Sequence, residues 1–381
     1  MIPLAVPNLD GNEARYLEEC VTSTFVSTVG PFVDTFEFLV AKASGSLRAV
    51  ATQSGTAGLH LALTAMGVGR DDLVILPSFT FIASANAISH CGATPWLFDV
   101  TPESWNLGPT SLAGRLEKET RREKESLIHV PTGRRVAAVM PVHTLGLPAD
   151  MDRIVEIARS YGLPVITDAA AALGATDKGR PVGHLGADLN VFSFNGNKTV
   201  TAGGGGAVTG DDAALMDFVR HLSTTARSGA DYHHDHIGFN YRMTNLQAAV
   251  GCAQMERIDE LVDAKRRIRR RYDQHLGDLS GVGIFPEVPG VESACWLSGI
   301  IINAELQTTV SELRDKLRAA EIDTRPFWKP VHMQPPYADA PFANMDVSES
   351  LWPNVLTLPC STGLNESDQD SVIAAVRKAL S

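Results

Sequence analysis

Short apolar runs alternate with helical patterns through the middle of the chain, and this alternation constrains the fold more than any other feature. Strands that alternate with helices require crossover connections, which predicts a mostly parallel sheet. Functional residues are then expected in loops at the carboxyl ends of the strands. The expected strands cover 73–77, 94–100, 136–142, 163–168 and 188–194, and expected helices cover 58–66 and 150–161, the second capped by Asp150.

A change in composition after the middle of the chain predicts a second domain. Thr244 and Gln247 fit a capping box that opens a helix, and a long charged helix is expected near 256–277. We therefore expect an α/β fold with a large domain over 1–255 and a smaller α+β domain over 256–381, within 381 residues.

Two polar regions are interpreted as surface. The stretch 107–135 is charged and contains glycine, which is typical of an excursion outside the core. The basic clusters Arg121-Arg122 and Arg266 to Arg271 are interpreted as solvated faces.

Charge and cysteine usage narrow the class of protein. The net charge of −11 disfavours a nucleic-acid partner, since an acidic chain repels phosphates. The five cysteines are scattered without a CxxC pair, so we expect reduced thiols, no bound metal and a cytoplasmic location. The chain start lacks a basic and apolar leader, and no apolar run could span a membrane.

The segment SFNGNKTVTAGGGG at 193–206 carries the densest chemical signal. It follows an apolar strand and places Lys198 in a loop of small residues. A lysine in a crowded, apolar loop has a lowered pKa, which makes its amine a nucleophile towards carbonyls. A surface-loop lysine remains the alternative when this segment is taken alone.

Two further positions extend the pattern. Asp168 ends the strand 163–168 and is expected to face the ligand crevice, although it could instead cap a helix over 169–173. Ser54 to Ala57 open the helix 58–66, where backbone N–H groups could bind a phosphate or simply receive a cap.

The order of these features resembles the fold-type I pyridoxal-phosphate (PLP) enzymes, and more narrowly the DegT/DnrJ/EryC1/StrS sugar aminotransferases. The resemblance is greatest to the branch that aminates the C4 ketone of UDP-linked 2-acetamido-2,6-dideoxy-hexos-4-ulose, on routes to bacillosamine or legionaminic acid. It implies L-glutamate as the amino donor and a homodimer with a shared active site. The motifs that carry it are SGTAGLHLAL, PSFTFIASANAI, FDVTPESWNL, PVHTLGLPADMD, SFNGNKTVTAGGGG, HIGFNYRMTNLQAAVGCAQMER and TRPFWKPVHMQP.

The resemblance also implies roles for individual residues. Lys198 would form the Schiff base with PLP and move the proton, and Asp168 would bind the pyridine nitrogen. Lys329 and His332 are candidates near the sugar nucleotide, with a partly buried structural histidine as the alternative for His332. The remaining implied cofactor contacts are Phe81 as the stacking ring, Gly55, Thr56 and Ser193 at the phosphate, and Asn240 from the neighbouring subunit.

One position departs from the family pattern. Ala171 stands where the family has Glu, Gln or His near the ring hydroxyl of PLP, and Thr167 is a lesser departure. Alternative functions are therefore the same chemistry on a 3-ketosugar nucleotide or keto-cyclitol, or a PLP-binding protein with altered activity. A PLP-dependent sugar dehydratase is disfavoured because Lys198 is present, and a nucleotide-binding oxidoreductase because the glycines lack G-x-G-x-x-G spacing.

Overall fold

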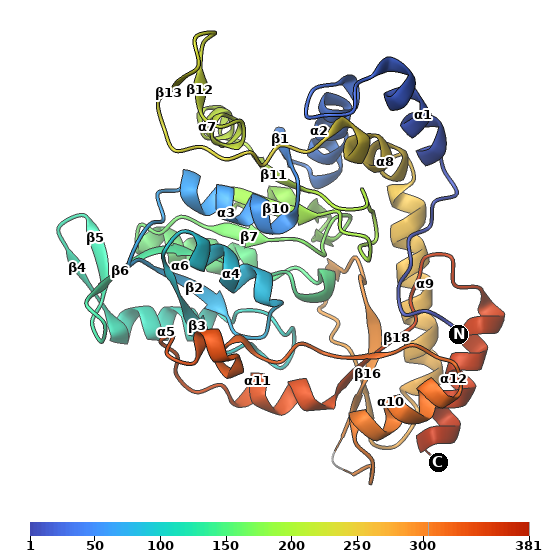
Figure 1. Cartoon of the computed structure of the whole chain (residues 1–381). Helices are drawn as coiled ribbons and strands as arrows, with labels where there is room; N and C mark the ends of the chain where they lie inside the picture. The colour runs from blue at the N-terminus through green and yellow to red at the C-terminus, as the bar shows by residue number, and fades with distance from the viewer. Residues whose placement is uncertain (304, 381) are drawn as a thin grey trace.

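The computed structural model describes residues 1–303 and 305–380. A mostly parallel sheet lies at the centre of the fold, with helices on both faces (Figure 1). Two parallel bridges, Val139 to Val165 and Val142 to Asp168, join two groups of strands into one sheet. β11 runs antiparallel to both of its neighbours, β10 and β1. In spatial order the strands are β3 (Thr94–Phe98), β2 (Leu73–Pro77), β6 (Arg134–Val139), β7 (Ile166–Asp168), β10 (Leu189–Ser193), β11 (Gly206–Gly210) and β1 (Arg48–Thr52).

Both faces of this sheet are apolar, because successive side chains of a strand point to opposite faces. In β2, Leu73 and Ile75 join one buried cluster, while Val74 and Leu76 join another. The first cluster is covered by α2 (Pro31–Ser44), α5 (Pro109–Glu119), α6 (Met151–Ser160) and α8 (Asn245–Met255), and the second by α3 (Gly55–Ala65), α4 (Ile82–His90) and α7 (Ala213–Ser223).

The predicted strands and helix starts of this region are confirmed, with ends that differ by up to three residues. The Asp150 side chain accepts the N–H of Arg153 and caps α6. Thr244 and Gln247 form the expected capping box at α8.

The interpretation of 107–135 as a surface excursion is wrong in part. Leu112 and Leu116 lie one helical turn apart on α5 and are buried in the first cluster. β5 (Ser126–His129) pairs antiparallel with β6, and β4 (Thr120–Glu123) pairs with β5, so the hairpin extends the sheet. Arg121 and Arg122, in the edge strand β4, are exposed, as predicted.

The C-terminal region is a smaller α+β unit, shown in gold, orange and red in Figure 1, as the sequence predicts. Its antiparallel sheet and helices enclose a third apolar cluster. The division between residues 255 and 256 falls between α8 and α9 and stays a prediction. Its elements are α9 (Ile258–Leu276), β14 (Val282–Ile284), β16 (Ser298–Ile302), α10 (Val310–Ala319), β17 (Arg325–Pro326), β18 (Val355–Leu358) and α12 (Glu366–Leu380).

Arg269 corrects the interpretation of the second basic cluster. Its side chain is 7% exposed, donates to both carboxylate oxygens of Asp273 at 2.7–2.8 Å, and also donates to the Phe285 carbonyl. One face of α9 packs against the third cluster, so an arginine on that face is enclosed whatever its charge.

The remaining elements connect or flank these layers. The hairpin of β12 and β13 projects from the body at the top of Figure 1. Among the described helices, none combines the length and apolar character needed to cross a bilayer. These elements are α1 (Glu13–Ser23), η1 (Thr144–Gly146), β8 (Thr176–Asp177), β9 (Arg180–Pro181), η2 (Val182–His184), β12 (Arg227–Ser228), β13 (His233–His234), β15 (Val291–Glu292), η3 (Val331–Met333), η4 (Pro335–Tyr337), α11 (Asp346–Leu351) and η5 (Trp352–Asn354).

Candidate active site

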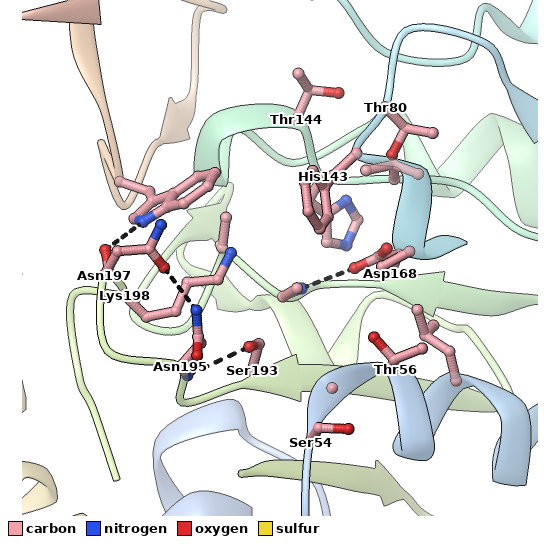
Figure 2. Close-up of a pocket in the computed structure, with 18 of the residues that line it drawn as sticks. Ser54, Thr56, Thr80, His143, Thr144, Asp168, Ser193, Asn195, Asn197 and Lys198 are labelled. Carbon is pink, nitrogen blue, oxygen red and sulfur yellow. Dashed lines mark hydrogen bonds between the residues drawn. The ribbon is translucent and has the colours of Figure 1, made fainter. Parts of the chain in front are cut away.

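Lys198 lies in the loop between β10 and β11, and its side chain enters a cavity of about 370 Å³ (Figure 2). The Lys198 backbone N–H donates to the Asn195 carbonyl at 2.9 Å, and Nζ lies 3.6 Å from the centre of the Trp296 ring. Burial lowers the pKa of Lys198 from 10.5 to about 8, against the opposing attraction of the Asp168 carboxylate. A useful fraction of the amine is therefore neutral and nucleophilic near neutral pH.

Asp168 ends β7 and lines the same cavity with 7% of its surface exposed. Its Oδ2 accepts from the Ser84 hydroxyl at 2.6 Å, and Oδ1 accepts from the Ala170 N–H at 3.1 Å. Residues 169–173 form turns, so the alternative of a helix cap is wrong. Within the described residues no cationic side chain forms an ion pair with Asp168. Because a buried carboxylate is costly without a cationic partner, this wall fits a protonated pyridine nitrogen.

Another wall of the cavity suits a phosphate. Gly55 and Thr56 form the first turn of α3 behind the N-cap Ser54, where the helix dipole favours an anion. Ser193, at the end of β10, lines the same wall. A Cβ on Gly55 would lie only 3.0 Å from the Ser193 Cβ, so the close approach of α3 to β10 requires a glycine here.

The predicted stacking ring, Phe81, also lines the cavity. It immediately precedes α4 and is 54% exposed, although it is a large apolar residue. Its ring centre lies 5.8 Å from that of Trp328. Phe81 can therefore offer a free aromatic surface to a planar ligand.

Three of the predicted residues are not brought to this cavity within one chain. Lys329 is exposed, and its Nζ lies 5.9 Å from the Trp352 ring. His332 is buried, with Nδ1 2.7 Å from the Ser78 hydroxyl and Nε2 3.0 Å from Glu349, which is the geometry of a structural histidine. Asn240 is exposed beyond the hairpin, and its contribution to a neighbouring subunit stays a prediction.

Sequence reasoning missed several lining residues. Trp296 and Trp328 come from the C-terminal unit, far along the chain from Lys198, so no local pattern could place them here. His143 lies in the quoted motif PVHTLG, directly after the segment that bridges to Asp168, and its position at a strand end was the signal available.

Comparisons with known proteins agree with this geometry. The model of the DegT/DnrJ/EryC1/StrS aminotransferase family matches residues 7–377. The chain belongs to this family. A GDP-perosamine synthase of Caulobacter vibrioides is 41% identical over 381 residues, which are 100% of this chain and 98% of the relative.

Solved structures support the same assignment. A family aminotransferase from Brucella abortus is 29% identical with a TM-score of 0.88, covering 97% of this chain and 95% of its own. DesI, crystallised with its TDP-sugar product, is 32% identical with a TM-score of 0.87, covering 100% of this chain and 92% of its own. The chain is a PLP-dependent sugar aminotransferase with the fold-type I architecture.

The residues that line the cavity fit PLP. When bound, PLP supplies an aldehyde that condenses with amines and a pyridinium ring that accepts electrons. Lys198 would hold the aldehyde carbon, Asp168 would keep the ring nitrogen protonated, and the first turn of α3 would bind the phosphate. Lys198 Nζ, once neutral, can take a proton from a carbon atom held beside it.

Proposed function

We propose that this aminotransferase moves an amino group from L-glutamate to the C4 ketone of a nucleotide-linked 4-keto-6-deoxy sugar. The observation that carries the proposal is the Lys198 amine and the Asp168 carboxylate in one cavity, with a phosphate-binding wall beside them. The name of the 41% identical relative, GDP-perosamine synthase, favours a sugar aminated at C4 and linked to GDP. The sequence-based prediction was a UDP-linked 2-acetamido sugar, so the nucleotide is the first point to test.

A second cavity offers room for the nucleotide. It has a volume of about 370 Å³ and shares Asn197, Trp296 and Trp328 with the cavity of Lys198. Arg325 lines it, is exposed and pairs with Asp323. The guanidinium of Arg325 suits a diphosphate, and the two indole rings suit the apolar face of a sugar. The acceptor would then lie across both cavities with its ketone at Lys198.

Lys198 does the proton work in both halves of the proposed reaction. Its Nζ takes a proton from Cα of glutamate and, in the second half, returns a proton to C4 of the sugar. The nitrogen leaves glutamate, which becomes a 2-oxo acid, and ends on the sugar in place of the ketone oxygen, which leaves as water. Such a reaction is ping-pong, because the first product leaves before the acceptor reacts.

A homodimer would complete this site through Asn240. The hairpin before it carries Tyr232, which is 78% exposed in the single chain, and Ile237 in the segment after the hairpin is 89% exposed. Exposed apolar residues on and beside a projecting hairpin are typical of a surface that a second copy covers. Sedimentation analysis would test this dimer.

The decisive experiment offers the purified enzyme L-glutamate with a panel of ketosugar nucleotides. The panel contains GDP-4-keto-6-deoxymannose, UDP-2-acetamido-2,6-dideoxy-hexos-4-ulose and a 3-ketosugar nucleotide. Mass spectrometry detects the amine, and NMR assigns the carbon that carries it. We expect the amine at C4 and a kcat/KM for one 4-ketosugar on the order of 10-fold or more above the 3-ketosugar. Amination at C3, or no amine with any acceptor, would contradict the proposal.

Arg325→Ala separates the nucleotide subsite from the chemistry. We expect a raised KM for the sugar nucleotide and an unchanged rate of 2-oxoglutarate formation in a single turnover with glutamate. Lys198→Ala, the matched control, should abolish both reactions.

A further inference from the structure

His143 is a buried polar residue of the active-site cavity to which the reaction above gives no role. It follows Val142, which bridges to Asp168, and its backbone N–H donates to the Asp168 carbonyl at 3.0 Å. The residue is 1% exposed and lines the cavity together with Lys198 and Asp168. Its imidazole is therefore fixed beside the reacting groups.

The hydrogen bonds of His143 define which ring nitrogen carries the proton. Nδ1 accepts the backbone N–H of Ala149 at 3.1 Å, so a neutral ring must carry its proton on Nε2. Burial lowers the pKa of His143 to about 4, which keeps the ring neutral at physiological pH. Nε2–H is thus a hydrogen-bond donor, and it has no partner among the described residues. Buried donors are almost always paired in folded proteins, so this one is available to an acceptor on a ligand in the cavity.

The loop that carries His143 is held rigidly. The Thr144 hydroxyl donates to the Trp105 carbonyl at 2.9 Å, and the Thr144 N–H donates to the Asn106 side chain at 3.0 Å. A Cβ on Gly146 would lie 2.6 Å from the Ala171 carbonyl oxygen, so this loop packs directly on the turn after Asp168. The Ala171 side chain is a methyl group and offers no hydrogen bond to the cavity it lines.

The cavity walls match the order of the substituents on PLP. In PLP the aldehyde carbon and the ring nitrogen lie at opposite ends of the ring, and the phosphate arm and the hydroxyl flank the aldehyde carbon on opposite sides. In Figure 2, Lys198 and Asp168 lie at opposite ends of the cavity, with Ser54 and Thr56 on one side and His143 on the other. A PLP ring held by the first three walls would turn its hydroxyl towards the side of the cavity on which His143 lies.

The geometry points to His143 as the residue whose Nε2–H donates a hydrogen bond to the ring hydroxyl oxygen of PLP, a contact that Ala171 cannot make. A donor at this oxygen stabilises its ionised form. His143 is then a cofactor-binding residue with no part in proton transfer, because it stays neutral. The inference rests on PLP as the cofactor and is independent of which sugar is the acceptor.

The test compares PLP with 3-deoxypyridoxal phosphate, which lacks the ring hydroxyl, in the apo form of the full chain. Dissociation constants are measured from the quenching of tryptophan fluorescence, and no sugar is present. We expect the wild-type protein to bind PLP about 10-fold more tightly than the analogue, since a hydrogen bond to an ionised group is worth roughly this factor or more. Equal affinity of the wild type for the two ligands would overturn the inference.

Two substitutions assign the effect to His143. His143→Phe keeps an aromatic ring but removes the donor, so it should bind PLP about 10-fold more weakly and lose its preference over the analogue. His143→Gln keeps a donor without an aromatic ring, so it should retain most of that preference. If His143→Phe kept the preference for PLP and His143→Gln lost it, the imidazole ring would act by stacking on PLP, and the inference would be wrong.

A third variant protects the test against misfolding. Ala171→Gln supplies a donor from the neighbouring turn, and in the His143→Phe background it should restore the preference for PLP. The absorbance of bound PLP against pH gives a second reading, with a higher midpoint in His143→Phe than in His143→Gln. If His143→Phe does not fold, the comparison of His143→Gln with the wild type still tests the inference. Loss of the preference for PLP over the analogue in His143→Gln would refute the role of His143 as a donor.

Discussion

The Lys198→Met substitution tests the electrostatic cost of keeping an amine inside the active-site cavity. Methionine keeps an unbranched, flexible side chain of similar length and removes the charge. In the folded chain the pKa of Lys198 is lowered from 10.5 to about 8, so at pH 7 the ammonium is less stable there than in the unfolded chain. The substitution should therefore stabilise the apoprotein while it abolishes transamination.

The size of the effect follows from the two pKa values. At about 1.4 kcal/mol per pH unit, a fall from 10.5 to about 8 corresponds to roughly 3 kcal/mol at pH 7. Lys198 is partly exposed and its Nζ also contacts the Trp296 ring, so we expect about 1–2 kcal/mol of net stabilisation. In a chain of 381 residues that is a rise in Tm of about 1–3 °C.

The pH dependence separates this explanation from better packing. Between pH 8 and 10.5 the unfolded chain keeps a proton on Lys198 that the folded chain releases. The free energy of unfolding of the wild-type apoprotein therefore increases as the pH rises through this window. The difference in Tm between the Lys198→Met and wild-type apoproteins should accordingly be smaller at pH 9.5 than at pH 7. Thermal unfolding of both apoproteins at the two pH values measures it. An equal advantage at both pH values, or none at pH 7, would refute the reasoning, and the exposed Lys118→Met serves as the neutral control.

The remaining predictions concern packing, a buried ion pair and thiol reactivity. Gly251→Ala should lower the free energy of unfolding by about 1–3 kcal/mol, because the new Cβ would lie 2.5 Å from the Phe36 ring. Gly114→Ala in α5 meets open space and should raise the free energy of unfolding by up to about 1 kcal/mol through helix propensity. Urea unfolding compares the two variants. Arg269→Ala should lower the free energy of unfolding by about 3–5 kcal/mol in the same assay, since it leaves the half-buried Asp273 carboxylate unpaired. A decrease below about 1 kcal/mol would contradict the burial of the Arg269 side chain. Burial raises the pKa of Cys252 to about 12, so this thiol should resist Ellman's reagent at pH 8 until the protein unfolds.

Local patterns were sufficient wherever a short segment determines its own structure. The caps at Asp150 and Thr244 and the strands 73–77 and 188–194 depend on neighbours within a few residues, and the structure confirms them. The stretch 107–135 was misinterpreted because its overall polarity concealed two leucines at helical spacing.

The sequence by itself determined the family, the fold class and the cofactor, because these depend on motifs that keep their order along the chain. Lys198 and Asp168 are expected at strand ends on these grounds, and parallel strands bring such ends to one edge of a sheet. Only the tertiary structure decided what surrounds them. Trp296 reaches Lys198 from the C-terminal unit, and the donor on His143 became visible only when its burial and the bond from Ala149 to its Nδ1 were known. Contacts of this kind join residues far apart in sequence, and burial depends on the whole fold, so no local spacing records them.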